Sequence, residues 1–321
     1  MRNYLIRRVL QMIPVFIVIM IAVFLLIHSA PGDPVTGMID PKMTPEMKEH
    51  LRATMGLDQP LWKQFASWVS QLLSGNLGYS TYFKKPVADV IGSFIFPTFI
   101  LALFALVLSL AIGIPAGIVS ATRQYSTGDN VLSVFSLVGL SMPTFFFGIL
   151  LIKFLSVDFG WFPMFGMMDQ AVRNAPWHVK TVNILHHMVL PGIVLGLGQT
   201  ASFMRYTRSA MLDVIRQDYI RTARAKGLRE KVVIYRHALR NAMIPIITLL
   251  GFQLPGLLSG AVMTESVFGW PGLGKVGVDA IFHRDYPLLM TINMMDTFLL
   301  MAGMLLSDIL YGVVDPRIKY D

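Results

Sequence analysis

Residues 9–27 read VLQMIPVFIVIMIAVFLLI, an apolar run that follows the basic segment 1–8. A helix of about 20 apolar residues crosses the hydrocarbon core of a membrane. The apolar part of a cleaved signal peptide is shorter, normally about 7–15 residues. We therefore expect residues 1–30 to form an N-terminal tail and a first transmembrane helix that is not cleaved.

Five more apolar runs follow the first one along the chain. We place them at residues 97–121, 131–157, 188–209, 242–263 and 288–314. Over the whole chain 54% of residues are hydrophobic and only 14% are charged, whereas a soluble domain carries about 25% charged residues. Several runs contain helix breakers such as Pro143, which membrane helices tolerate where neighbouring groups satisfy the backbone. The sequence therefore predicts an all-α integral membrane protein with six transmembrane helices.

The positions of lysine and arginine predict how these helices are oriented. Segment 205–241 holds ten basic residues, while residues 31–96 hold six basic and six acidic ones. Loops rich in lysine and arginine stay in the cytoplasm, and long loops count little in this rule. We therefore expect both termini and segment 205–241 in the cytoplasm, and residues 31–96 in an extracytoplasmic loop. This topology also accounts for the formal charge of +8, so no nucleic-acid partner is predicted.

The extracytoplasmic loop contains a second helical pattern. Apolar side chains recur there at helical spacing, at Leu61, Trp62, Phe65, Trp68, Val69 and Leu72. Such spacing predicts a short amphipathic helix. Its apolar face either lies on the outer surface or a partner, or packs on the protein's own spans, and both alternatives remain open.

Residues 213–245 read DVIRQDYIRTARAKGLREKVVIYRHALRNAMIP. Tyr219, Ala223 and Gly227 follow one another at intervals of four, which places them on one helical face. Small residues on that face let another surface approach the backbone closely, and Gly227 suits the position just after a helix end. The spacing predicts a short helix on the cytoplasmic membrane face that serves for docking. The alternative is an ordinary loop that is basic only because it lies inside.

The run Thr222–Gly227, with Asn241 and Pro245 downstream, resembles the EAA loop of ABC-importer permeases. In that family the loop forms a coupling helix that fits a groove of the cytoplasmic ATPase. The resemblance implies a cytoplasmic coupling loop over residues 210–241. It also implies ATPase contacts by Tyr219, Arg221, Ala223, Arg224, Ala225 and Gly227, with Arg221 at the family's first acidic position.

Further motifs extend the resemblance over nearly the whole chain. They are Ala30–Pro34 (APGDP), Gly56–Pro60 (GLDQP), Gly75–Gly78 (GNLG), Ser141–Pro143 (SMP), Glu265–Gly274 (ESVFGWPGLG), Arg284–Pro287 (RDYP) and Asp315–Arg317 (DPR). In this order they resemble the first of the two permeases in dipeptide, oligopeptide and nickel importers. The resemblance implies the type I ABC-importer permease fold in the bacterial inner membrane, with residues 97–321 as a five-helix core.

The same resemblance implies the partners and the cargo. The expected partners are a second, similar permease, two cytoplasmic ATPases, an extracytoplasmic solute-binding protein and membrane lipid. ATP hydrolysis would then belong to separate chains, so the protein is not expected to be an enzyme. Peptides are the favoured substrate, with glutathione, nickel or a metallophore as alternatives within the family.

One segment comes close to a nucleotide-binding motif. Residues 269–276 read GWPGLGKV, and Val276 stands where a phosphate-binding loop needs a hydroxyl for magnesium. We interpret the segment as a structural turn. The chain has no cysteine, which excludes thiol chemistry, and no histidine spacing suggests zinc. No metal or other cofactor is predicted.

Polar residues inside the spans are candidates for the translocation pathway. Asp296 lies well inside the sixth span with Asn293 one turn before it, and Gln199 lies in the fourth. Charges within a membrane are costly and are functional candidates by default. These three residues either line a path for a zwitterionic peptide or form interhelical hydrogen bonds. A rival hypothesis is a stand-alone secondary transporter in which Asp296 carries protons.

Overall fold

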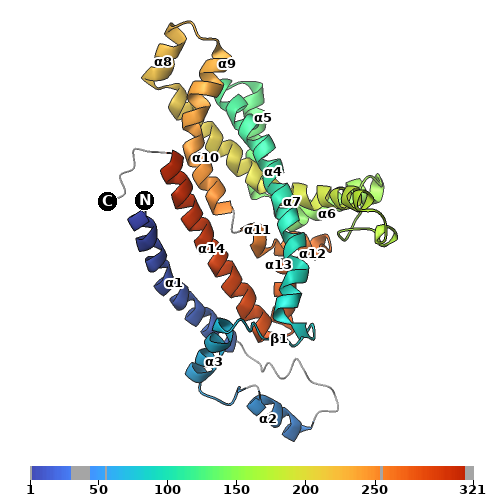
Figure 1. Cartoon of the computed structure of the whole chain (residues 1–321). Helices are drawn as coiled ribbons and strands as arrows, with labels where there is room; N and C mark the ends of the chain where they lie inside the picture. The colour runs from blue at the N-terminus through green and yellow to red at the C-terminus, as the bar shows by residue number, and fades with distance from the viewer. Residues whose placement is uncertain (1, 30–43, 55, 254–255, 315–321) are drawn as a thin grey trace.

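A computed structural model describes residues 2–29, 44–54, 56–253 and 256–314, and helices make up most of them (Figure 1). The long elements are α1 (Arg2–Ser29), α4 (Val87–Thr122), α5 (Thr127–Ser141), α7 (Trp177–Ile215), α10 (Leu239–Gln253) and α14 (Tyr286–Val314). The short helices are α2 (Pro45–Thr54), α3 (Leu61–Leu73), α6 (Thr144–Leu151), α8 (Asp218–Ala225), α9 (Glu230–Val232), α11 (Gly256–Ser259), α12 (Val262–Val267) and α13 (Leu273–Phe282). Two π-helices, η2 (Ile152–Asp158) and η4 (Val233–Ala238), a 3₁₀ turn, η3 (Gln170–Val172), and the strands β1 (Tyr79–Ser80) and β2 (Lys85–Pro86) complete the described elements.

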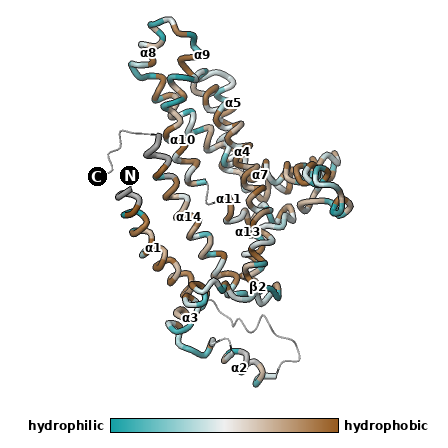
Figure 2. The backbone as a smooth tube through the Cα atoms, in the orientation of Figure 1, coloured by the Kyte–Doolittle hydropathy of each residue, from teal (hydrophilic) through white to brown (hydrophobic). Residues whose placement is uncertain are grey.

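The described residues contain five helices that are long and apolar enough to cross a membrane. They are α1, α4, α7, α14 and the run Glu230–Ser259, which includes α10. Figure 2 shows these helices as mainly hydrophobic and α2 as mainly hydrophilic. A sixth span is present if the bent pair of α5 and α6–η2 is taken as one. The predicted all-α membrane fold is therefore confirmed.

The third predicted span, residues 131–157, is not one straight helix. The chain bends by 107° between α5 and α6, and α6 leaves the bundle sideways (Figure 1). The bend lies at Met142 and Pro143, where Pro143 has no N–H to donate and forces the residue before it into an extended conformation. Met142 is indeed extended, with ψ at 125°. A continuous third span is therefore corrected to two helices joined at a proline.

Two other helices are longer than their apolar runs. α4 begins at Val87 and α7 at Trp177, where the apolar runs predicted starts at 97 and 188. The loop assigned to residues 31–96 thus includes the first turns of α4.

Within that loop α3 forms where the apolar spacing predicted it. Its Phe65 ring meets Phe24 of α1 at 5.2 Å, so this face packs on the protein's own span, while Trp62 stays 68% exposed.

A buried carboxylate fastens the hairpin of β1 and β2 to the start of α14. Asp285 is fully buried and accepts hydrogen bonds from the Ser80 hydroxyl and from the Tyr82 N–H at 3.1 Å. Its other oxygen accepts from the N–H of Leu288 at 3.3 Å, in the first turn of α14. One side chain therefore satisfies a helix start and holds a distant hairpin.

The ends of the chain's first and last helices lie at the same end of the bundle. α1 begins and α14 ends toward the side where α8 lies, whereas α3 and the hairpin lie at the opposite end (Figure 1). Arg8 of α1 pairs with Asp308 of α14 at 2.8 Å. This arrangement is the one that an even number of membrane crossings requires.

Among the described helices, α4 and α7 make the most extensive contact with each other. At Gly117 of α4 an added Cβ atom would lie 2.6 Å from the Thr207 Cβ and 2.7 Å from the Met204 carbonyl oxygen, both on α7. At Gly113, one turn earlier, it would lie 2.8 Å from the Thr200 carbonyl oxygen. Small residues four apart are typical of membrane helices whose backbones touch.

We predict that Gly117→Ala destabilises the protein and that Gly92→Ala does not. Both glycines lie in α4, but no atom lies within 4 Å of a Cβ added at Gly92. Overpacking a tight contact costs about 1–3 kcal/mol, so Gly117→Ala should lower the Tm in detergent by several degrees. Equal melting temperatures of the two variants would contradict the tight α4–α7 contact.

Candidate functional site

Helix α8 is short because its sequence supplies a stop. Gly227 has a φ of +73°, a conformation that glycine adopts without strain. The N–H of Gly227 donates to the Arg224 carbonyl oxygen at 2.9 Å, and the N–H of Leu228 donates to that of Ala223 at 3.4 Å. These two bonds form the glycine-terminated Schellman cap. Gly227 therefore ends the helix at the place that the sequence pattern indicated.

The inward face of α8 packs on the ends of two spanning helices. Ile220 is fully buried and Ala223 is 7% exposed. Both belong to a cluster that includes Ile118 of α4 and Met211 of α7. Ala223 is therefore covered by the protein's own core, so of the three residues predicted to share a docking face Tyr219 and Gly227 are exposed and Ala223 is not. The small Ala223 side chain lets α8 lie close to α4 and α7.

The remaining positions predicted for ATPase contacts are exposed. Arg221 lies 3.4 Å from Asp218 in a solvent-exposed pair, and Ala225 and Gly227 are exposed as well. Arg224 pairs with Glu230 at 2.7 Å, and its hydrogen bonds to that carboxylate hold the pKa of Glu230 below its usual value. The face of α8 turned away from the bundle thus carries charge and small side chains.

Tyr219 connects α8 to a further helix. Its hydroxyl oxygen accepts a hydrogen bond from the Asn241 side-chain amide of α10 at 2.8 Å. Asn241 also donates to the carbonyl oxygen of His237, one turn before it. Tyr219 and Asn241 were both singled out in the sequence, but their contact across 22 residues was not foreseen.

A buried ion pair near α8 was missed by sequence reasoning. Asp129 at the start of α5 is 3% exposed and accepts two hydrogen bonds of 3.0 Å from Arg208 of α7. It also accepts from the Ser120 hydroxyl of α4 and from the Tyr125 N–H at 2.9 Å. The only sequence signal is Ser126 three residues before Asp129, a spacing typical of a helix start. That spacing says nothing about Arg208.

The three pathway candidates lie in two separate places. The Gln199 side chain accepts a hydrogen bond from the Ser109 hydroxyl of α4 at 3.4 Å. Asn293 donates to the Leu289 carbonyl oxygen within α14 at 2.8 Å. Asp296 lies one turn further along α14, and no hydrogen bond among the described residues joins Gln199 to these two. Gln199 therefore serves at least as an interhelical contact.

Asp296 differs from the other two candidates. Its side chain hydrogen-bonds to Ser259, at the end of α11. Its second oxygen, Oδ1, is buried and has no hydrogen-bond partner among the described residues. An unpaired carboxylate oxygen in a buried place is energetically costly, so Asp296 is a group of the spans that can still accept a hydrogen bond.

The segment that resembles a nucleotide-binding motif encloses a carboxylate of the protein itself. Glu265 is fully buried and accepts from the Thr98 hydroxyl at 3.0 Å and from the N–H groups of Ala261 and Lys275 at 3.2 and 3.0 Å. A Cβ atom at Gly272 would lie 2.2 Å from the Glu265 carboxylate. The space that a phosphate would need is filled, and the segment is a structural turn as interpreted from Val276.

A bundle of apolar spans, with a bend at a proline between α5 and α6 and a polar helix packed on its end, defines a polytopic membrane protein. Residues 113–320 match the family described as binding-protein-dependent transport system inner membrane component, and residues 1–95 match the N-terminal family of the same system. The chain belongs to this family and is a multi-pass inner-membrane permease subunit of an ABC importer.

Curated relatives match over the full length of both chains. The oligopeptide transport system permease protein AppB of Bacillus subtilis (strain 168) is 43% identical over 321 residues. The dipeptide transport system permease protein DppB of Alkalihalophilus pseudofirmus is 38% identical over 333 residues. The glutathione transport system permease protein GsiC of Escherichia coli O6:H1 is 38% identical over 320 residues.

A solved structure agrees on the fold. The inward-facing MetNI methionine ABC transporter matches with a TM-score of 0.55 at 17% identity, over 71% of this chain and 97% of that chain. At this identity the likeness concerns the fold alone. It confirms the importer permease fold that the motifs implied.

We predict that Glu265→Ala strongly destabilises the protein, whereas Glu230→Ala does not. Without the Glu265 carboxylate, the Thr98 hydroxyl and two backbone N–H groups lose their acceptor in a buried place, at about 1–3 kcal/mol for each unsatisfied group. Glu230 lies in an exposed pair, and such pairs contribute about 0–1 kcal/mol. Thermal unfolding in detergent measures both, and similar losses in the two variants would refute this role of Glu265.

Proposed function

We propose that the chain forms one half of the translocation pathway of an ATP-driven importer for di- or oligopeptides. The full-length relatives named for oligopeptide, dipeptide and glutathione transport support a peptide cargo, since glutathione is itself a small peptide. A second, similar permease would form the other half. Two cytoplasmic ATPases would supply the energy, and an extracytoplasmic solute-binding protein would deliver the ligand.

The observation that carries this proposal is the placement of α8. One face of α8 packs on α4 and α7 through Ile220 and Ala223, and the other face is exposed. An ATPase that binds the exposed face of α8 would therefore move the ends of α4 and α7 together. The Tyr219–Asn241 hydrogen bond extends this movement to α10.

The Asp129–Arg208 pair makes the ends of three helices respond together to a movement of α8. It joins the end of α4, the start of α5 and the last part of α7. Breaking a buried ion pair costs about 3–5 kcal/mol, so these three ends move together rather than separately. In this proposal α8 with Arg221, Arg224, Ala225 and Gly227 faces the cytoplasmic ATPase, and both termini lie on the same side.

The pathway is proposed to pass Asp296 and Asn293 on α14. This position of the pathway is favoured because one oxygen of Asp296 is unpaired. Gln199 is kept as a more distant candidate. The same oxygen is what the rival hypothesis needs, because a proton carrier must also be a buried titratable group. Nickel or a metallophore is less favoured, because no group of three metal-ligating side chains is found among the described residues.

Reconstitution distinguishes the importer from the rival. Proteoliposomes with the complete importer and its solute-binding protein should take up trialanine only when ATP is supplied to the ATPases. The chain alone, in ATP-free vesicles with an imposed pH gradient, should take up none. Gradient-driven uptake by the chain alone, abolished by Asp296→Asn, would establish the secondary transporter instead.

We predict that Ala225→Trp on α8 prevents coupling. Ala225 is exposed and helical, so the added ring obstructs a partner rather than the protein's own core. It is a cleaner site than Gly227, where any side chain would strain the backbone at φ +73°. Co-purification of the ATPases and ATP-dependent uptake should both fall at least about tenfold, as expected for the centre of an interface.

Ser70→Trp on α3 is the matched control, since Ser70 is an exposed helical position at the opposite end of the bundle. It should leave ATPase co-purification at the wild-type level. Wild-type association and uptake in the Ala225→Trp variant would show that α8 is not the docking helix.

A further inference from the structure

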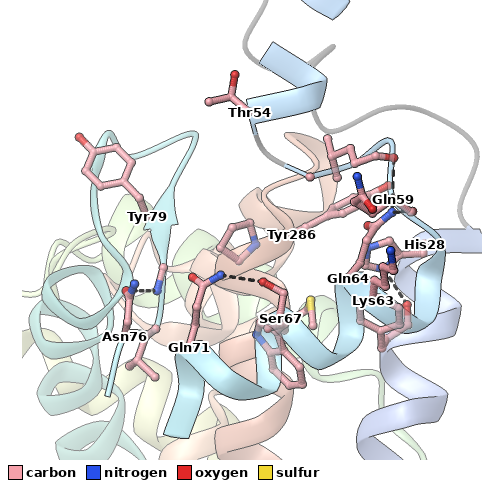
Figure 3. A pocket seen from close by; sticks show the side chains of 18 residues that line it. His28, Thr54, Gln59, Lys63, Gln64, Ser67, Gln71, Asn76, Tyr79 and Tyr286 are labelled. Atoms are coloured by element: carbon pink, nitrogen blue, oxygen red, sulfur yellow. Dashed lines mark hydrogen bonds between the residues drawn. The ribbon is translucent and has the colours of Figure 1, made fainter. Parts of the chain in front are cut away.

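A cavity of about 440 Å³ lies at the end of the bundle opposite α8. It opens to the surface and is lined by the end of α1, by residues that precede α3, by α3 itself, by the segment before β1 and by the first turns of α14 (Figure 3). Its volume falls within the range of about 300–1,000 Å³ that is usual for small-ligand sites. Neither the candidate pathway residues nor α8 contribute to it.

The walls of this cavity are held in place by the protein's own contacts. The side-chain amide of Gln64 donates to the carbonyl oxygens of Gln59 at 2.7 Å and Leu57 at 3.3 Å, and Gln64 also hydrogen-bonds to His28 of α1. The His28 ring stacks on Phe24 at 3.9 Å and meets Tyr286 of α14 at 5.2 Å. The cavity is thus preformed, which lowers the entropic cost of binding.

Other polar groups of the lining are not committed in this way. The side-chain amides of Gln59 and Asn76 and the hydroxyl of Tyr79 donate no hydrogen bond within the described chain. Gln71 gives only a long bond of 3.4 Å to Ser67, and Figure 3 shows this pair along α3 at the centre of the lining. Neutral amides and hydroxyls are the partners that a peptide backbone needs, because they both donate and accept.

The charge of the residues that line the cavity favours the carboxylate end of a peptide over its ammonium end. None of the 18 lining residues is acidic. The lining carries one lysine, Lys63, whose ammonium lies 5.5 Å from the centre of the exposed Trp62 ring. No ion pair of Lys63 occurs among the described residues. A carboxylate is therefore matched by charge, whereas a terminal ammonium group finds no counter-ion here.

We propose that this cavity binds the carboxylate end of a short peptide before the peptide enters the membrane pathway. The carboxylate pairs with Lys63, and the peptide groups that precede it bond to Gln71 and Asn76. Side chains of the ligand rest on the apolar floor that Trp68 and Leu77 provide. The proposal rests on the proposed function, since it takes the cargo of the importer to be a peptide.

Binding to the complete importer in nanodiscs, without the solute-binding protein, tests the site. The probes are trialanine and trialanine amide, which lacks the carboxylate, and isothermal titration calorimetry measures affinity. Wild type should bind trialanine saturably and the amide more weakly. Lys63→Gln should weaken trialanine by about fivefold and leave the amide unchanged, as expected for one partly exposed charge pair.

A pair of variants checks that the ligand occupies this cavity. Ser67 lines it and Ser70, one turn away on α3, does not. Ser67→Trp should abolish trialanine binding, and Ser70→Trp should bind as wild type does. Equal losses of both peptides in Lys63→Gln, unchanged binding in Ser67→Trp, or no saturable binding by wild type would each overturn the proposal.

Transport by the same preparations separates this inference from the proposed function. If the importer takes up trialanine with ATP while the cavity variants bind as wild type does, the carboxylate site is refuted and the peptide importer stands. If the importer takes up no peptide at all and wild type binds none, both proposals are refuted.

Discussion

In the hydrocarbon core of a membrane no water is available to bond a backbone N–H or C=O group. Every such group must be satisfied within the protein, so the spans of this chain are helices. The same constraint explains where the helices are interrupted. α5 and α6 part at Pro143, which has no N–H to leave unpaired. The membrane also explains the close approach of α4 and α7 at Gly113 and Gly117. In lipid the hydrophobic effect does not drive helices together, so they associate through van der Waals contacts, which small residues allow.

Among the described residues, the carboxylates of Asp129, Glu265 and Asp285 are buried, and each is surrounded by donors. Asp129 bonds to Arg208 and to neighbours on α4 and α5, Glu265 to Thr98 and two backbone N–H groups, and Asp285 to Ser80 and two more. Each joins segments that are far apart in the sequence, so these carboxylates fix the fold. Asp296 is the exception, because one buried oxygen has no partner among the described residues. That contrast is the reason why the proposed pathway is drawn past Asp296, since a charge within a membrane is costly.

The sequence predicts the features that depend on neighbouring residues, but it does not predict contacts between residues that are far apart in the chain. Apolar runs placed α1, α14 and the helix α3 correctly, because each depends on its own residues. The angle at Pro143 could not be predicted, since a proline allows a bend without setting its size. Periodicity placed Ala223 on the same face as Tyr219, but it could not show that α4 and α7 cover Ala223. Asp129 and Arg208 are 79 residues apart, and no local pattern relates them. Gly227 was predictable because a Schellman cap is made within a few residues.

Helices α14 and α10 connect the cavity near α3 with helix α8. Tyr286, at the start of α14, borders the cavity near α3, and α14 packs along α10. α10 carries Asn241, which holds Tyr219 of α8. Under the two proposals above, a ligand in the cavity and an ATPase at α8 would act on α14 and α10, which pack together. If the ligand prefers one arrangement of α14 and α10, then by linkage an ATPase that stabilises that arrangement must raise the affinity for the ligand by the same factor. In such an importer the coupling between the cavity and α8 would need no chain of many residues, because α14 contacts α10 and α10 contacts α8.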